Sequence, residues 1–311
     1  MTKHIGYKND LYVMPFDHRG SFQEKLFGIK GTPTAEQTAE IASYKDVIYE
    51  GFKKAIAAGV PAGKAGILAD EQFGANVLRR AKAEGFITAC PAEKSGQDEF
   101  DFEYGNEFGA HINKFDVTIV KVLVRYNPEA DATANIRQSE RLKKLSEYCH
   151  ANDRKFMFEL LVPATKTQLE SVNGSVQEYD LKLRPNLMVR AMKELQDFGV
   201  EPDLWKVEGV ETTEAVTAVA KQAKAGQGRE DVGVILLGRG ESAEKVGQWL
   251  TVAAAEKNMV GFAVGRTIFW EPLKGLKAGL WDKNTAADMV AKNFKGFCDL
   301  WITARKKAGW G

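Results

Sequence analysis

The sequence predicts a single α/β domain, residues 1–311, that closes into a (β/α)8 barrel. Short apolar runs rich in Val, Ile and Phe alternate with longer amphipathic segments, which is the pattern of parallel βα units. No Ser/Pro-rich linker, charge block or low-complexity segment divides the chain. Eight apolar runs are predicted strands: residues 11–16, 65–69, 86–90, 117–124, 155–161, 204–207, 233–237 and 260–264.

Amphipathic segments fill most of the intervals and are expected to form the outer helices. They are residues 35–58, 75–84, 136–150, 187–198, 214–225, 243–256 and 285–307. Residues 99–111 lack a helical period, so we expect a local hairpin or loop there. An open doubly wound sheet is the alternative fold, but it should carry a glycine-rich turn after the first strand. The first strand instead runs into Asp17-His18-Arg19-Gly20.

Composition restricts the class of partner. The 43 Lys and Arg residues nearly balance the 42 Asp and Glu residues, so no bulk field attracts nucleic acid or an acidic membrane. Residues 1–6 lack the apolar core of a signal peptide, and no stretch approaches the roughly 20 apolar residues that span a bilayer. A cytoplasmic location is expected. Cys90, Cys149 and Cys298 are odd in number and widely spaced, which predicts buried, reduced thiols.

Ionisable residues stand at or near the C-terminal ends of seven of the eight predicted strands, where barrel enzymes build their active sites. These residues are Asp17, Asp70, Glu71, Glu93, Lys94, Lys121, Glu159, Lys206 and Arg266. Convergence at one barrel mouth makes neighbouring polar residues candidates for substrate contacts. The expected substrate-binding residues are His18, Arg19, Asp70, Glu71, Lys94 and Arg239.

Lys121, Glu159 and Lys206 lie inside the apolar fourth, fifth and sixth strands. Burying a charge is costly unless the charge is paired or neutralised, so either an ion-pair cluster or a catalytic set is expected. Two close ammonium groups repel, and desolvation also disfavours charge, so both effects are expected to lower a lysine pKa. A neutral amine can attack a carbonyl, and Glu159 can then transfer protons.

Glycines and arginines follow the seventh and eighth strands, in the loops that usually bind phosphate in barrels. Gly238, Gly240 and Gly265 allow backbone N–H groups to approach an anion, and Arg266 can add charge-assisted hydrogen bonds. These four residues are the predicted phosphate site, with ordinary turn chemistry as the alternative.

The histidine inventory disfavours a metal centre. His4, His18, His111 and His150 are the only histidines, and no HxxxH, HExxH or paired-cysteine spacing occurs. His4 lies near the terminus, His150 is expected to cap a helix or face solvent, and His18 either contacts substrate or packs. We therefore expect neither a metal nor another cofactor, and a metal-dependent lyase is the weaker alternative.

Seven landmarks in this order resemble the class I aldolases of the tagatose-bisphosphate aldolase (LacD-like) group. They are residues 16–20, 67–74, 93–96, 120–123, 158–159, 204–208 and 265–267, and they cover nearly the whole barrel. The resemblance implies that Lys206 forms a Schiff base with a ketose phosphate and that Lys121 lowers its pKa. It also implies that Glu159 transfers protons and that Asp17 and Arg19 contact the substrate.

Residues 90–100 and 261–267 resemble more closely the aldolase-like domain often fused behind the sugar kinase of inositol catabolism. That resemblance implies cleavage of 2-deoxy-5-keto-gluconate 6-phosphate to dihydroxyacetone phosphate and malonate semialdehyde. Related barrels act on tagatose bisphosphate or sulfofructose phosphate. A non-catalytic sugar-phosphate binding protein is a further alternative, since a fold alone does not establish turnover. A homo-oligomer is the usual form of such barrels.

One departure from the LacD-like pattern affects the substrate. Gly238-Arg239-Gly240 stands where that group has a Ser-Ala-Gly run. Arg239 is expected either to hold a carboxylate or second anionic group, which favours an acid sugar, or to pair with Glu241.

Overall fold

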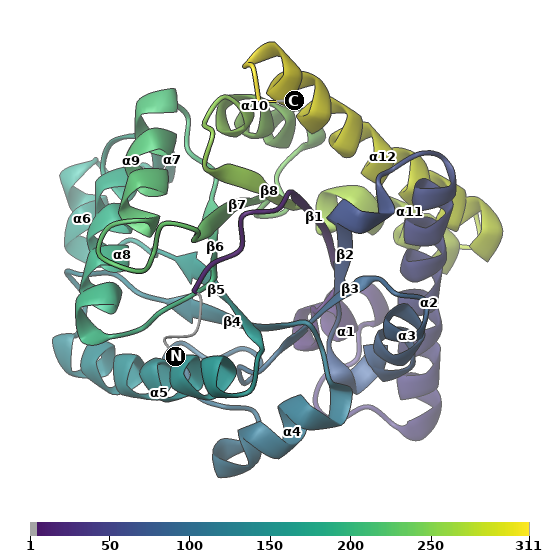
Figure 1. The fold of residues 1–311 in the computed structure, drawn as a ribbon. Coiled ribbons are helices and arrows are strands. Elements are labelled where there is room, and N and C mark those ends of the chain that lie inside the picture. Colours follow the sequence, from purple (N-terminus) through teal and green to yellow (C-terminus); the bar gives the residue numbers. More distant parts are fainter. Residues whose placement is uncertain (1–4, 311) are drawn as a thin grey trace.

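The computed structural model describes residues 5–310, which form one closed barrel of eight parallel strands in sequential order (Figure 1). Every predicted strand is present, with ends shifted by at most two residues. The strands are β1 (Leu11–Pro15), β2 (Ala65–Leu68), β3 (Ile87–Pro91), β4 (Ile119–Arg125), β5 (Lys155–Leu161), β6 (Leu204–Glu208), β7 (Gly233–Leu237) and β8 (Met259–Ala263). His4 lies outside the described residues.

Helices surround the strands on the outside of the barrel (Figure 1). The predicted ones are α2 (Ala35–Ala57), α3 (Glu71–Ala83), α5 (Ala132–Ala151), α8 (Arg184–Phe198), α9 (Thr213–Ala223), α10 (Ala243–Ala254) and α12 (Lys283–Lys307). Helices that the sequence pattern did not predict are α1 (Gly20–Phe27), α4 (Phe108–Phe115), α6 (Lys166–Ser171), α7 (Val176–Lys182) and α11 (Arg266–Lys277). Most of the missed helices are short, so few turns were available to establish a period. None of the helices in this part of the chain is long and apolar enough to cross a membrane.

Two segments correct the predicted boundaries. Helix α3 begins four residues before the predicted start because the Asp70 carboxylate accepts a hydrogen bond from the Phe73 N–H and caps the helix there. In residues 99–111, Phe102 forms an isolated antiparallel bridge with Glu93, which precedes the segment, as the strands of a hairpin would. The segment then enters the 3-10 helix Gly105–Glu107 and helix α4, so its end is helical.

Two apolar layers pack on opposite sides of the strands, because successive side chains on a strand point to opposite faces. Ile119, Met157 and Leu204 belong to the buried cluster inside the barrel. Neighbouring residues such as Cys90 pack outward against the helices. Cys149 and Cys298 are also buried and free, as predicted for all three cysteines.

Asp203, immediately before β6, is fully buried and joins three segments at the N-terminal end of the barrel. Its Oδ1 accepts hydrogen bonds from Gly6 N and Lys155 Nζ, each at 2.8 Å. Its Oδ2 accepts one from Phe156 N at 2.9 Å and lies 3.2 Å from His150 Nε2. The imidazole near the end of α5 is therefore part of a structural hydrogen-bond group.

Asp203→Ala is expected to lower the free energy of unfolding by about 3 kcal/mol, because each buried donor left unpaired costs about 1–3 kcal/mol. Burial raises the pKa of Asp203, but hydrogen bonds from His150, Lys155 and the backbone lower it by more. The contribution of Asp203 to the stability of the wild type is thus complete above the ordinary aspartate pKa of about 3.9. It is lost as the pH falls through the lowered pKa of Asp203 in the folded protein. Urea denaturation from pH 7 downward measures both effects.

Asp299→Ala is the matched control, because Asp299 forms an exposed ion pair with Lys295 one helical turn away. Such a pair contributes about 0–1 kcal/mol. Equal stability of the two variants would contradict the structural role of Asp203.

Candidate active site

A cavity of about 920 Å³ opens at the C-terminal ends of the strands. The alternation along each strand explains its polar lining. Ile119, Met157 and Leu204 point into the barrel, so the residues two positions later point the same way. Those residues are Lys121, Glu159 and Lys206, and all three line the cavity.

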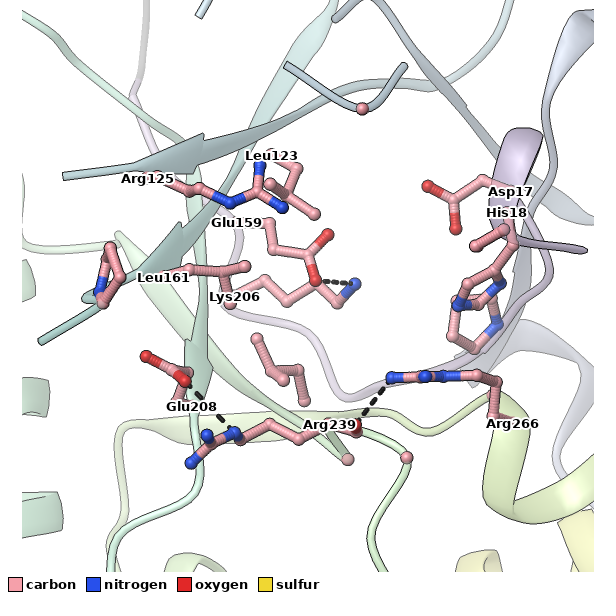
Figure 2. Close-up of a pocket in the computed structure, with 18 of the residues that line it drawn as sticks. Asp17, His18, Leu123, Arg125, Glu159, Leu161, Lys206, Glu208, Arg239 and Arg266 are labelled. Atoms are coloured by element: carbon pink, nitrogen blue, oxygen red, sulfur yellow. Dashed lines mark hydrogen bonds and ion pairs between the residues drawn. The ribbon is translucent and has the colours of Figure 1, made fainter. Parts of the chain in front are cut away.

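Glu159 lies between the two lysines. Its Oε1 is 2.8 Å from Lys206 Nζ and its Oε2 is 3.0 Å from Lys121 Nζ. Figure 2 shows the Glu159 and Lys206 side chains meeting within the cavity. Burial raises the pKa of Glu159, but the charges of Lys121 and Lys206 lower it by more. Glu159 is therefore a carboxylate at neutral pH, within hydrogen-bond distance of the Lys206 amine.

Lys121 is 2% exposed and is surrounded by carboxylates. Besides Glu159, its Nζ contacts Asp17 Oδ2 at 2.8 Å and Glu93 Oε1 at 2.7 Å. Burial lowers the pKa of Lys121, but Asp17, Glu159 and Glu93 raise it by more, to well above its ordinary value. The expected lowering of a lysine pKa therefore does not extend to Lys121. Its ammonium group contacts three acids, two from the loops after β1 and β3 and one from β5.

Asp17 and His18 face the cavity from the end of β1, across from Lys206 (Figure 2). Burial raises the pKa of Asp17, but Lys121 and Lys206 lower it by more, so Asp17 is ionised. Burial lowers the pKa of His18 to about 3, so its imidazole is neutral at pH 7. Within residues 5–310, the buried Nδ1 of His18 has no hydrogen-bond partner. A substrate hydroxyl could donate to this nitrogen.

The four predicted phosphate-site residues come together at one side of the cavity. Gly238, Gly240, Gly265 and Arg266 all line it. Gly265 precedes α11, and a Cβ at this position would lie 2.3 Å from the Pro15 carbonyl oxygen, so glycine permits the close approach of two strand ends. The N-terminus of α11 and the Arg266 guanidinium both favour an anion.

Arg239 is already paired with acids. Its Nη1 lies 2.6 Å from Asp180 Oδ2 in α7, and its Nε lies 3.3 Å from Glu208 Oε1 in β6. Arg239 therefore pairs with Asp180 and Glu208, and not with Glu241 as the alternative expected. Its carbonyl oxygen accepts a 2.6 Å hydrogen bond from Arg266 Nη2 (Figure 2). The backbone of Arg239 therefore holds Arg266, and two carboxylates compete for the Arg239 guanidinium.

Arg125, at the end of β4, was missed by the sequence analysis. It lines the cavity, and its Nη1 donates a 2.6 Å hydrogen bond to the Gln97 carbonyl oxygen. No acidic side chain of the described chain lies within 4.0 Å of its guanidinium nitrogens. The sequence feature that could have identified Arg125 is its position four residues after Lys121, on the same inward face of β4.

The other predicted substrate-binding residues lie in different surroundings. Lys94 is exposed at the cavity rim. Arg19 also lines the cavity, but its guanidinium donates to the Glu93 carbonyl oxygen at 2.6 Å and to Glu103 Oε2 at 3.1 Å. These bonds tie the loop after β1 to the loop after β3.

Asp70 and Glu71 lie outside the residues that line the cavity, which corrects their predicted role. Asp70 is fully buried, caps α3 and forms a 3.0 Å ion pair with Lys45. Because β2 ends at Leu68 and α3 begins at Glu71, both carboxylates turn toward the helix layer.

A sequence model described as "Uncharacterized protein conserved in bacteria (DUF2090)" matches residues 1–305. The chain belongs to the DUF2090 family. No curated protein sequence matches the DUF2090 chain significantly.

Solved structures share its fold. A fructose-bisphosphate aldolase from Plasmodium falciparum, in complex with TRAP and a small-molecule inhibitor, aligns with a TM-score of 0.65 and 13% identity, covering 96% of this chain and 90% of the other. Cgl0159 from Corynebacterium glutamicum aligns with a TM-score of 0.56 and 17% identity, covering 94% and 87%. At these identities the likeness establishes the (β/α)8 fold.

Lys121→Met should lower the free energy of unfolding at pH 7 by about 3–5 kcal/mol, because removing one partner leaves buried charges uncompensated. Without the ammonium group, Asp17, Glu93 and Glu159 have raised pKa values in the folded state. Protonation of these carboxylates at lower pH then relieves the cost of the buried charges. The loss in free energy of unfolding of Lys121→Met should therefore shrink from pH 7 to pH 5. Urea denaturation at both pH values measures it.

Lys274→Met is the control, since Lys274 forms an exposed 3.3 Å pair with Glu271. Its expected effect is below about 1 kcal/mol. A Lys121→Met deficit that grows toward acid pH would contradict the three-carboxylate account.

Proposed function

We propose that this DUF2090 protein is a class I aldolase in which Lys206 forms a Schiff base with a ketose phosphate. The observation that carries the proposal is the buried contact of Lys206 Nζ with Glu159 Oε1, at 2.8 Å, inside the cavity at the barrel mouth. The resemblance to LacD-like aldolases supports the same assignment of Lys206. The shared fold of a fructose-bisphosphate aldolase is compatible with it.

The first step joins Lys206 to the substrate ketone. Glu159 first accepts a proton from Lys206 Nζ, which leaves a neutral amine that attacks the carbonyl carbon. A second N–H proton passes to the alkoxide oxygen to give the carbinolamine, and Glu159 then returns its proton to the carbinolamine hydroxyl, which leaves as water. The product is an iminium ion. Lys121 contacts the second Glu159 oxygen at 3.0 Å, so its ammonium group keeps that carboxylate in position for both transfers.

The second step breaks the carbon–carbon bond. Asp17, across the cavity from Lys206, accepts the proton of the substrate hydroxyl beyond that bond (Figure 2). The electron pair of the bond moves to the iminium, giving an aldehyde and an enamine. Protonation of the enamine carbon and hydrolysis of the imine then release the ketone product and free Lys206.

For the substrate we propose 2-deoxy-5-keto-gluconate 6-phosphate, cleaved to dihydroxyacetone phosphate and malonate semialdehyde. Its ketone lies beside the phosphorylated carbon, and its carboxylate is at the opposite end. Arg266 and the glycines beside it suit the phosphate, and Arg125, without an acidic partner in the described chain, suits the carboxylate. The two arginines lie on opposite sides of Lys206 (Figure 2). A second phosphate, as in tagatose bisphosphate, is the alternative occupant at Arg125.

Borohydride added with dihydroxyacetone phosphate should give a stable adduct on Lys206, detected by peptide mass spectrometry, because the imine is reduced to a secondary amine. Lys206→Ala should lose both the adduct and cleavage of ketose phosphates, since no other amine reaches Glu159 Oε1 in the described structure. Retained cleavage in Lys206→Ala would rule the mechanism out.

The exposed Lys94 at the rim provides the control, and Lys94→Ala should leave the adduct on Lys206 intact. Calorimetric binding of ketose phosphates with neither adduct nor product would instead identify a sugar-phosphate binding protein.

Arg125→Gln should lower kcat/KM for 2-deoxy-5-keto-gluconate 6-phosphate about 10- to 150-fold, because a hydrogen bond to a charged group contributes about 1.5–3 kcal/mol. Borohydride trapping of dihydroxyacetone phosphate should be unchanged, since that ligand has no carboxylate. Arg266→Gln is the comparison variant and should weaken both assays, because Arg266 is assigned to the phosphate that both ligands carry. Equal losses in both assays for Arg125→Gln would contradict carboxylate recognition.

A further inference from the structure

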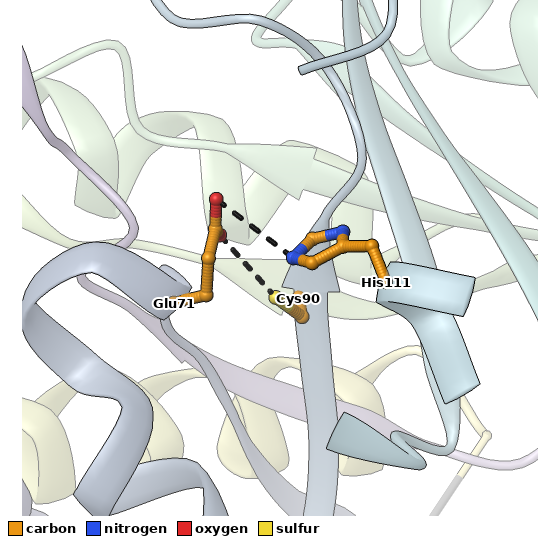
Figure 3. A group of neighbouring side chains, drawn as sticks. All are labelled: Glu71, Cys90 and His111. Atoms are coloured by element: carbon orange, nitrogen blue, oxygen red, sulfur yellow. Dashed lines mark hydrogen bonds and ion pairs between the residues drawn. The ribbon is translucent and has the colours of Figure 1, made fainter. Parts of the chain in front are cut away.

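Glu71, Cys90 and His111 meet behind β3, on the helix side of the barrel wall and outside the cavity (Figure 3). They come from the first residue of α3, from β3 and from α4. Cys90 Sγ lies 3.7 Å from Glu71 Oε2, and His111 Nε2 lies 3.9 Å from Glu71 Oε1. One ligand atom from each residue fits within 4.8 Å of the other two.

His111 is the unexplained member of this group. Its side chain is 7% exposed, and its buried Nε2 has no hydrogen-bond partner within residues 5–310. The 3.9 Å separation from Glu71 is too long for a hydrogen bond. Tyr104 stacks on the ring with 4.0 Å between centroids, and Phe115 contacts its edge. The ring is therefore held with an unpaired nitrogen directed at a carboxylate and a thiol (Figure 3).

We propose that Glu71, Cys90 and His111 bind one divalent metal ion of the zinc class, with water in the fourth position. Thiolate sulfur, imidazole nitrogen and carboxylate oxygen are the ligand types that zinc takes in proteins. Metal–ligand bonds of about 2.0–2.3 Å in a tetrahedron separate ligand atoms by about 3.3–3.7 Å. The observed 3.7 and 3.9 Å need only small side-chain movements to match. On binding, the Cys90 thiol loses its proton to solvent and the sulfur becomes a thiolate ligand.

The surrounding charges are compatible with a cation. The carboxylate and the thiolate together balance a doubly charged ion. Arg19 Nη1 lies 3.5 Å from Glu71 Oε1, but its charge is offset by Glu103, whose Oε2 lies at 3.1 Å from the same nitrogen. The ion would link α3 and α4 to β3, so bound metal should stabilise the folded protein.

The test is a titration of the full-length protein, first stripped of metal with a chelator, using Co²⁺ as the probe. One equivalent should bind and produce thiolate-to-cobalt charge-transfer absorption, and Zn²⁺ should displace it and raise the melting temperature. Cys90→Ser should abolish the charge-transfer absorption. His111→Asn should weaken binding more than about 100-fold, because loss of an outer hydrogen-bond partner alone costs 10–100-fold.

Cys149→Ser and Cys298→Ser are matched controls, since both thiols are buried elsewhere, and both variants should bind Co²⁺ like the wild type. Circular dichroism checks folding, and if Cys90→Ser does not fold, His111→Asn and Glu71→Gln decide. Co²⁺ binding without charge-transfer absorption, or undiminished binding by the His111→Asn and Glu71→Gln variants, would overturn the proposal. Lys206→Ala should bind Co²⁺ normally, so this site and the Schiff-base proposal fail independently.

Discussion

The ion pairs of Lys121 are the constraint on which the barrel mouth depends. One buried ammonium group contacts carboxylates that arrive from β1, from the end of β3 and from β5. Several carboxylates this close would repel one another and take up protons, and each would be costly to bury alone. With Lys121 present, Asp17 and Glu159 remain ionised. The same contacts therefore determine both the arrangement and the protonation state of the cavity lining.

This arrangement gives Lys121 a different role from the one expected from the sequence. From the sequence, Lys121 and Lys206 are expected to be ammonium groups that repel each other. In the structure Glu159 lies between them and contacts one lysine with each oxygen. Repulsion is thereby screened, and in the proposed mechanism Lys121 acts on Lys206 by holding the carboxylate that accepts its proton. A base at 2.8 Å provides a direct route to a neutral amine.

The fold and the centre of the site were predictable because both follow from periodicity. Apolar runs defined all eight strands, and alternation along them directs Lys121, Glu159 and Lys206 inward together. Alternation does not predict the direction of side chains beyond the end of a strand. Asp70 stands two residues after the end of β2, as Asp17 does after β1, yet it turns away to cap α3 and to pair with Lys45.

Side-chain contacts between distant segments of the chain could not be predicted from the sequence either. The acids that pair with Arg239 include Asp180 in α7, a seven-residue helix too short to show a period. Arg125 likewise lacks an acidic partner in the described chain because of how the chain folds, and no local sequence pattern predicts this. Glu71, Cys90 and His111 are about 20 residues apart with no ligand motif, and only the packing of α3 and α4 against β3 brings them together.

Arg19 connects that outer group with the cavity. One end of its guanidinium lies 3.5 Å from Glu71, and the other donates to the carbonyl oxygen of Glu93, whose carboxylate contacts Lys121. A change in the charge at Glu71 is thus three contacts away from the ammonium group of Lys121: Glu71 to Arg19, Arg19 to Glu93, and Glu93 to Lys121. Because Arg19 also bonds Glu103, weakening its contact with Glu71 leaves it anchored. With this double anchoring, metal binding at the proposed outer site would leave the loop after β1 fixed and Asp17 in its place opposite Lys206.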